Sequence, residues 1–121
     1  MICLDTNVLI EILKNNPETL KKLQQLNMGF AISSISAMEL LYGALNKKEL
    51  EKLQLFIGKF KIIHLDQAMS EHGLALIADY AKSHALDIPD ALIAATCIVH
   101  KLPLFTYNLK DFRFIPGLVV I

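Results

Sequence analysis

The first thirteen residues, MICLDTNVLIEIL (1–13), place an aspartate between two apolar segments. Residues 1–4 are predicted to form a short buried strand, and the apolar residues that follow recur at helical spacing. Asp5, Thr6 and Asn7 are residue types favoured at a helix N-terminus, so capping alone would explain them. The same position is the carboxyl end of a strand, where open α/β sheets bind their ligands. This stretch leaves both interpretations open.

The remainder of the chain alternates between helical and extended patterns. Apolar residues at three- and four-residue spacing predict helices at 8–15, 16–26, 36–45, 47–60, 66–84 and 88–100. A turn is expected at 108–112, and short apolar runs predict strands at 1–4, 29–33, 61–65, 102–107 and 117–121. Strands that alternate with helices predict a short, mainly parallel sheet covered on both faces. The expected fold is an α/β three-layer α/β/α sandwich made of one domain, residues 1–121.

Apolar spacing also predicts which helix faces are buried. Helix 88–100 is apolar almost all round, which is typical of a buried central helix. In helix 36–45, Met38, Leu41, Tyr42 and Leu45 recur at the spacing of a core-facing stripe. We therefore expect these four side chains to contribute to the core.

The composition favours a protein of a reducing cytoplasm. Apolar residues make up 54% of the chain, but none of the apolar runs approaches the roughly 20 residues of a membrane span. The N-terminus has neither the basic region nor the cleavage site of a signal peptide. Cys3 and Cys97 lie inside apolar segments, so they are expected to be small core residues rather than a disulfide or zinc ligands. The excess of apolar residues predicts a partner protein or a dimer interface.

Charge balance narrows the ways in which this chain can bind nucleic acid. It carries 12 basic and 12 acidic residues and therefore has no net charge. This balance argues against binding through bulk positive charge. It allows a protein whose acidic residues are concentrated in one site while its lysines lie elsewhere.

Acidic residues recur where predicted strands end or predicted helices begin. Asp5 follows the first strand, Glu39 lies in the first turn of helix 36–45, and Asp90 opens helix 88–100. The segments that follow parallel strands emerge at one edge of a sheet, so these three acids can meet in one cleft. Two further polar residues, Asn108 and Asp111, follow the strand at 102–107.

Each acid also has a local explanation. Ser36 and Glu39 match a capping box, in which a serine and a glutamate cap a helix together. Asp90 beside a helix N-terminus is stabilised by the helix dipole. Asp111 is explained as a solvated turn residue, and Asp87 as a solvated loop acid. Three such acids in one chain nevertheless favour a common site over three separate caps.

A cluster of carboxylates predicts a divalent cation. Like charges held together repel, and burial of an unpaired charge is costly. Oxygen ligands suit Mg²⁺ or Mn²⁺, and Mg²⁺ retains several waters when one or two carboxylates hold it. Such an ion recruits phosphate, lowers the pKa of a bound water and stabilises a leaving oxygen. The pattern therefore indicates phosphodiester chemistry.

Four segments resemble the ordered motifs of the PIN-domain ribonucleases, and the resemblance extends over essentially the whole chain. They are LDTNVLIEIL (4–13), SSISAMELLYGA (33–44), IPDALIAATCI (88–98) and FTYNLKDFRFIPGLVV (105–120). The short single-domain form resembles the VapC toxins of type II toxin–antitoxin systems. The resemblance implies a cytoplasmic Mg²⁺-dependent endoribonuclease, with Mn²⁺ as a substitute ion, an RNA substrate, a cognate antitoxin and a homodimer.

The resemblance also assigns roles to individual residues. Asp5 and Asp90 match the metal-binding aspartates, and Glu39 matches the glutamate of the family. The residues that match polar groups supporting the site are Thr6, Asn7, Ser36 and Thr106. Asn108 departs from the pattern, because many PIN domains carry a fourth acid at this place. An asparagine adds no charge, which weakens the case for a second, tightly held metal; Asp111 is the alternative acid.

The implied reaction is hydrolysis of an RNA phosphodiester. Asp5, Glu39 and Asp90 would hold Mg²⁺ directly or through water, and a water would attack in line to leave a 5′-phosphate and a 3′-hydroxyl. The apolar stripe within residues 40–56 is the expected docking surface for an antitoxin, whose Arg or Lys would enter the acidic cleft.

Other functions fit the residues less well. A haloacid-dehalogenase phosphatase needs an aspartate where this chain has Asn7, and a receiver domain needs an acidic pair and a lysine that are not evident. A metal-independent ribonuclease would use a histidine pair, but the four histidines share no motif: His64, His72, His84 and His100. Two alternatives stay open: a non-catalytic PIN-like module that binds RNA or protein, and a PIN nuclease of RNA processing without an antitoxin.

Overall fold

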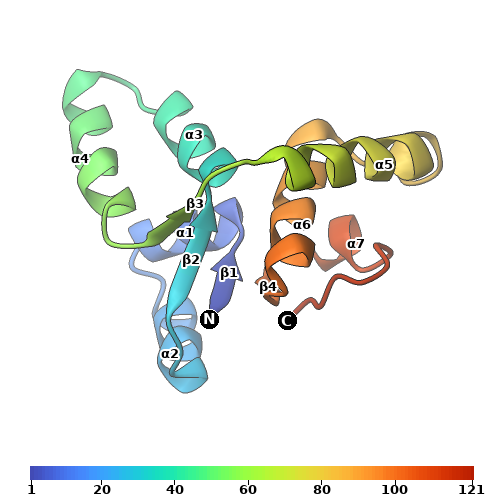
Figure 1. Ribbon diagram of the computed structural model, residues 1–121. Coiled ribbons are helices and arrows are strands. Elements are labelled where there is room, and N and C mark those ends of the chain that lie inside the picture. The colour runs from blue at the N-terminus through green and yellow to red at the C-terminus, as the bar shows by residue number, and fades with distance from the viewer.

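Four short parallel strands form the centre of the computed structural model, which describes residues 1–121 (Figure 1). Their order in the sheet is β3-β2-β1-β4, so β1 lies between β2 and β4. Cys3 pairs with Ala31 of β2 on one side and with Leu104 of β4 on the other. The strands are β1 Ile2–Leu4, β2 Phe30–Ser33, β3 Lys61–Ile63 and β4 Leu104–Phe105.

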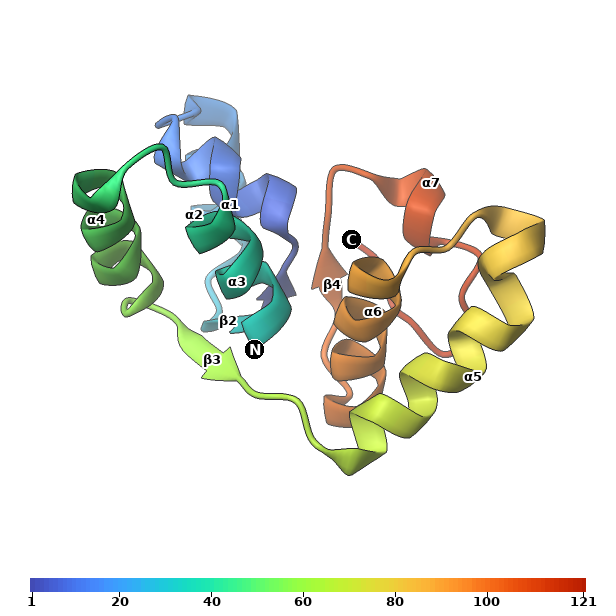
Figure 2. The same cartoon turned by 90° about the horizontal axis from the view of Figure 1, so that it is seen from above.

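Helices cover both faces of this sheet. They are α1 Thr6–Leu13, α2 Pro17–Leu26, α3 Ser34–Tyr42, α4 Lys47–Ile57, α5 Gln67–His84, α6 Ile88–His100 and α7 Leu109–Phe112. Figure 2 shows α1 to α4 on one side of the molecule and α5 to α7 on the other. The predicted three-layer α/β/α sandwich with a parallel sheet is confirmed.

The alternation of side chains along β1 divides the core into two parts. Ile2 and Leu4 pack with residues of α1, α3 and α4, whereas Cys3 packs against α6 on the opposite face. This follows from the two-residue period of a strand. All three side chains of β1 are buried, so the strand that carries the chain to Asp5 is held from both faces.

Capping side chains explain where most of the helices begin. Six helices have an N-cap side chain that accepts a hydrogen bond from a backbone N–H: Asp5, Asn16, Ser33, Asn46, Asp66 and Asp87. Pro17 and Pro89 lie in the first turns of α2 and α6, where a missing N–H costs little. The predicted starts at Asn16 and Asp66 are thereby confirmed.

Helix α3 differs from its predicted form. It begins at Ser34 and is capped by Ser33, so the predicted capping box at Ser36 is wrong and Glu39 lies in the second turn. Ser36 is fully buried. Burial of this polar residue is tolerated because its hydroxyl bonds to Thr6.

The predicted core stripe of the same helix is wrong for three of its four members. Met38, Tyr42 and Leu45 are 57%, 94% and 85% exposed, while Ala37 and Leu40 form the buried face. Leu41 is half-buried and packs against the core, as predicted. The apolar spacing is correct for a helix, but the hydrogen-bonded Ser36 turns the other face inward. A wide apolar surface therefore remains exposed on α3.

The C-terminal region contains less strand than predicted. The expected strand at 102–107 shortens to β4, since Pro103 has no N–H to donate to a ladder. The expected turn at 108–112 contains α7, and the expected strand at 117–121 makes one isolated bridge, Leu104 with Val120. Backbone bonds still tie Val119 and Ile121 to Leu104.

Cys3 and Cys97 are buried free thiols, as predicted. A hydrogen bond to Cys3, followed by burial, raises the pKa of the Cys97 thiol well above its usual range. This contact joins β1 to α6, the two elements that carry Asp5 and Asp90. Among the helices, none combines the length and the apolar character that crossing a membrane requires.

Candidate active site

Asp5 is the most buried acid of the chain and lies at the end of β1. Its side chain is 4% exposed. One carboxylate oxygen, Oδ1, accepts from the Thr6 N–H at 2.8 Å, and the other, Oδ2, accepts from the Thr106 hydroxyl at 2.7 Å. Both oxygens are thus oriented by donors, one from α1 and one from the segment after β4. Asp5 is the N-cap of α1 and a buried site carboxylate at the same time.

The Thr6 hydroxyl links α1 to α3. Its Oγ1 lies 2.8 Å from Glu39 Oε1 and 2.9 Å from Ser36 Oγ. A hydroxyl carries one proton and a carboxylate only accepts, so Thr6 donates to Glu39 and Ser36 donates to Thr6. Glu39 is thereby held on the same edge of the sheet as Asp5, although 34 positions separate them in the chain.

Thr106 and Asn7 connect the segment after β4 to α1. Thr106 Oγ1 accepts from the Asn108 N–H at 3.0 Å and lies 3.5 Å from Asn7 Nδ2. Asn7 Oδ1 accepts from the Tyr107 N–H at 3.2 Å. The Asn108 side chain makes no hydrogen bond. These contacts fix the Thr106 hydroxyl that orients Asp5.

Asp90 lies in the first turn of α6, and its carboxylate has no hydrogen-bond or ion-pair partner. Its N–H donates to Asp87 Oδ1 at 2.9 Å, so Asp87 is the N-cap of α6. Asp87 is exposed and lies outside the helix, as predicted, but its capping role was not predicted. Sequence reasoning missed this cap, although Asp87 directly precedes Ile88-Pro89, a helix-start signal.

Electrostatics brings Asp5, Glu39, Asp90 and Asp111 into one cluster. Burial raises the pKa of Asp90 to about 7, and the charges of Asp87, Asp5, Asp111 and Glu39 add to this rise. Burial also raises the pKa of Asp5; the bonds from Thr106 and Thr6 oppose the rise, while the charges of Glu39 and Asp111 reinforce it. The negative charge of Asp111, on α7, therefore acts on the predicted metal ligands Asp5 and Asp90.

The cluster has the properties of a divalent-cation site. No basic side chain neutralises it, because the only ion pair of the protein joins Lys14 to Glu11 on α1. All available donors are oxygens, which suits Mg²⁺ or Mn²⁺. No three acidic, histidine or cysteine side chains lie close enough together to bind one ion directly. The oxygen donors nevertheless fit a hard divalent ion, and Asp5 and Asp90 are the carboxylates that would hold it.

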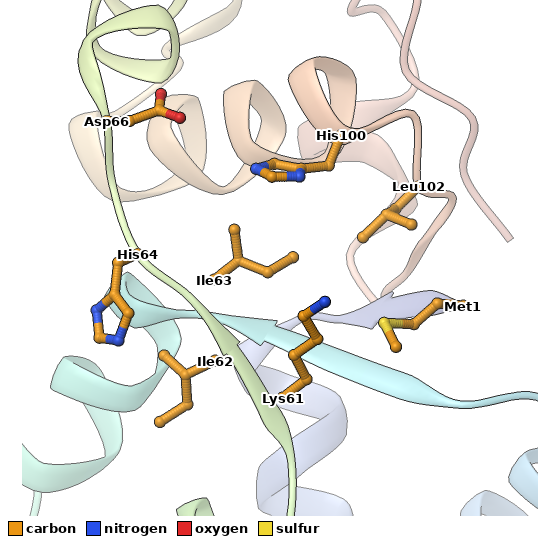
Figure 3. A pocket seen from close by; sticks show the side chains of 8 residues that line it. All are labelled: Met1, Lys61, Ile62, Ile63, His64, Asp66, His100 and Leu102. Atoms are coloured by element: carbon orange, nitrogen blue, oxygen red, sulfur yellow. The ribbon is translucent and has the colours of Figure 1, made fainter.

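His64 and His100 lie away from this cluster. They line a cavity of about 470 Å³ beside β3, together with Lys61 and Asp66. Figure 3 shows the side chains that line this cavity. None of the predicted site residues lines this cavity.

One contact near the acidic site was not predicted from the sequence. The Tyr107 hydroxyl lies 2.6 Å from the buried Thr19 Oγ1 of α2, and it thereby helps to hold the segment after β4 against the helices.

Comparison with known proteins identifies the family. A model of the PIN domain matches residues 2–117. The tRNA(fMet)-specific endonuclease VapC of Shigella flexneri is 31% identical over 121 residues, covering 95% of this chain and 92% of that protein. Ribonuclease VapC1 of Methanocaldococcus jannaschii is 33% identical over 113 residues, with 93% and 79% covered.

A solved structure agrees with both sequence relatives. A toxin–antitoxin complex from Klebsiella pneumoniae contains a chain that is 35% identical and superimposes with a TM-score of 0.83, over 100% of this chain and 96% of that one. The match extends over the sheet, the helices and the segment after β4, and it therefore includes every element that carries an acid of the cluster. The chain belongs to the PIN-domain family, in which its relatives are the VapC ribonucleases.

Proposed function

We propose that this protein is a divalent-metal-dependent endoribonuclease and the toxin of a toxin–antitoxin pair. The observation that carries the proposal is the uncompensated cluster of Asp5, Glu39 and Asp90 in a member of a ribonuclease family. Carboxylates that raise one another's pKa values favour a cation between them. Mg²⁺ is the expected ion, with Mn²⁺ as a substitute.

Each residue of the cluster has a defined part in the proposed reaction. Asp5 and Asp90 would hold the ion, which supplies charge neutralisation at the phosphate and lowers the pKa of a water. Glu39, held by Thr6, accepts the proton of the attacking water. In-line attack breaks the bond between phosphorus and the 3′-oxygen and leaves a 5′-phosphate and a 3′-hydroxyl.

The polar residues around the acids act by positioning. Thr106 and the Thr6 N–H fix the two oxygens of Asp5, and Ser36 supports Thr6. Asn7 holds the backbone that follows Thr106. The side chain of Asn108 is unbonded and free to turn toward a metal-bound water, which suits a weak outer role in place of a fourth acid.

The partners of the protein are proposed from its exposed apolar surface and its relatives. Tyr42, Leu45 and Leu55 of the 40–56 region are 94%, 85% and 75% exposed. Such a surface suits a docked antitoxin segment and a homodimer contact. A basic residue of the antitoxin would enter the acidic cluster in place of the metal. Buried free thiols at Cys3 and Cys97 suit a reducing cytoplasm.

The deciding experiment measures cleavage of a transfer and ribosomal RNA pool with Mg²⁺, with Mn²⁺ and with excess EDTA. We expect cleavage only with added metal and a loss of at least about 100-fold in Asp5→Asn, because loss of an outer partner already costs 10–100-fold. Glu51→Gln, at an exposed acid on α4, is the matched control. Cleavage that persists in EDTA would contradict the mechanism, and RNA binding without cleavage would favour the non-catalytic module.

A further inference from the structure

A groove of about 540 Å³ lies between the C-terminal end of α5 and α7, next to the acidic cluster. The side chains that line it include Lys82, His84, Lys110, Asp111, Arg113 and Phe114. In Figure 2, α7 lies beside the end of α5. Three full positive charges therefore gather around one hollow in a chain whose net charge is zero.

These cations have no partner within the protein. Lys82, Lys110 and Arg113 are exposed, and the single ion pair of the protein lies elsewhere, on α1. Cations at the C-terminus of α5 are stabilised by the helix dipole, which accounts for Lys82. The dipole of α5 does not explain why Lys110 and Arg113, from another element, line the same groove. Their free charges are available to an anionic ligand.

The groove also contains an exposed aromatic face. The His84 ring stacks on Phe114 with centroids 4.2 Å apart and an interplanar angle of 18°, and Tyr80 contacts both rings. Ser83 Oγ lies 2.8 Å from His84 Nδ1. The imidazole is thus held flat in the wall of the groove. Flat rings beside cations are the usual means of binding a single nucleic-acid strand, since each base offers a face for stacking.

Asp111 links the groove to the acidic cluster. Asp111 lines the groove, and its charge acts on both Asp5 and Asp90. The two walls also lead directly to the cluster, because α5 ends just before Asp87 and α7 begins just after Thr106. A strand that places one phosphate at the acids must pass beside them, and the acids repel its other phosphates. Cations outside the cluster offset this repulsion.

We propose that the groove formed by Lys82, His84, Lys110 and Arg113 binds the RNA backbone on one side of the phosphodiester to be cut. The inference rests on the proposed ribonuclease function and adds the path of the substrate. Phosphate contacts of this kind fix the position of a strand without reading its sequence. An acidic protein segment could also pair with these cations, but its carboxylates would not stack on the His84 ring as a base would.

The test compares two triple variants with the same change in charge. Lys82→Gln/Lys110→Gln/Arg113→Gln removes the groove cations. Lys47→Gln/Lys48→Gln/Lys52→Gln removes three exposed lysines of α4, which Figure 2 shows at the far end of the molecule. Binding of a fluorescein-labelled 12-nucleotide RNA is followed by anisotropy in EDTA between 50 and 200 mM salt. This readout needs no metal and no cleavage, so it is independent of the test of catalysis.

The groove variant should bind the RNA at least about tenfold more weakly at 50 mM salt. Its slope of log affinity against log salt should fall by about 2, from roughly 0.7 for each lost phosphate contact. The α4 variant should match the unmodified protein. Equal losses in both variants, or no loss in the groove variant, would overturn the proposal. So would a 12-residue polyglutamate that binds as tightly as the RNA and is lost in the same variant, because the groove would then serve an acidic protein segment.

Discussion

Replacing Thr106 by valine removes the hydroxyl that orients Asp5 while it preserves the shape of the side chain. That hydroxyl donates to Asp5 Oδ2 at 2.7 Å in a buried setting and accepts from the Asn108 N–H. A hydrogen bond to a charged group contributes about 1.5–3 kcal/mol, so we expect the free energy of unfolding to fall by about 2 kcal/mol at neutral pH. The pKa of Asp5 should rise further, because this bond opposes the effect of burial.

The same substitution should weaken metal binding more than it weakens the fold. Loss of a group that orients a metal ligand typically costs 10–100-fold in affinity, so the Mg²⁺ midpoint for RNA cleavage should rise by about that factor. The deficit should shrink as the pH rises, because protons then compete less with the ion for Asp5, whose pKa is raised by burial. Isothermal titration with Mn²⁺ provides a readout that does not depend on cleavage, and urea unfolding measures stability.

Thr106→Ser is the matched control, since it keeps the hydroxyl and loses only the methyl group. It should retain a midpoint close to that of the unmodified protein, even if burial of a smaller side chain lowers stability. A Thr106→Val protein with an unchanged Mg²⁺ midpoint would refute the positioning role. Equal shifts in both variants would assign the effect to packing instead of the hydrogen bond.

Three further predictions concern charge and partners. Without metal, the free energy of unfolding should fall as pH rises from about 4 to about 7. The reason is that the folded state keeps Asp90 protonated up to about pH 7, whereas Asp90 of the unfolded chain ionises near pH 3.8. Urea midpoints measured against pH should show this fall, and Asp90→Asn should make them less dependent on pH. Asn108→Asp should lower the Mg²⁺ midpoint by adding a fourth charge, and an unchanged midpoint would mean that position 108 does not face the ion. Light scattering should give a dimer at micromolar concentration, and Tyr42→Glu, at a side chain that is 94% exposed, should weaken either dimer or antitoxin binding; a monomer that its neighbouring gene product does not bind would contradict the toxin assignment.

Local patterns made much of the site predictable. Asp5 follows an apolar strand and precedes an apolar helix, and both its burial and its capping role follow from that order. Asp87 has an equally local signal for its capping role in Pro89, two residues later. Thr106 could be assigned only by resemblance, since its bond to Asp5 spans 101 positions.

The start of α3 could not be decided from local preference. Ser33, Ser34 and Ser36 are all suitable caps, so sequence preference does not select among them. The hydrogen bond between the hydroxyls of Thr6, on α1, and Ser36 selects the start of α3. It holds Ser36 in the interior, so that Ser33 is left as the N-cap. The exposed positions of Met38 and Tyr42 follow from that tertiary contact, which apolar spacing cannot register.

The long span between Asp5 and Thr106 has a consequence for the timing of toxicity during synthesis. A ribosome makes Asp5 among the first residues, but the hydroxyl that orients it is added 101 positions later. Backbone bonds from Val119 and Ile121 then hold Leu104 and the end of β4. A nascent or prematurely terminated chain therefore lacks one of the two donors that orient the Asp5 carboxylate, however well its first helices fold. The proposed active site is therefore complete only when translation is nearly finished, so a cognate antitoxin would need to act only on the finished chain.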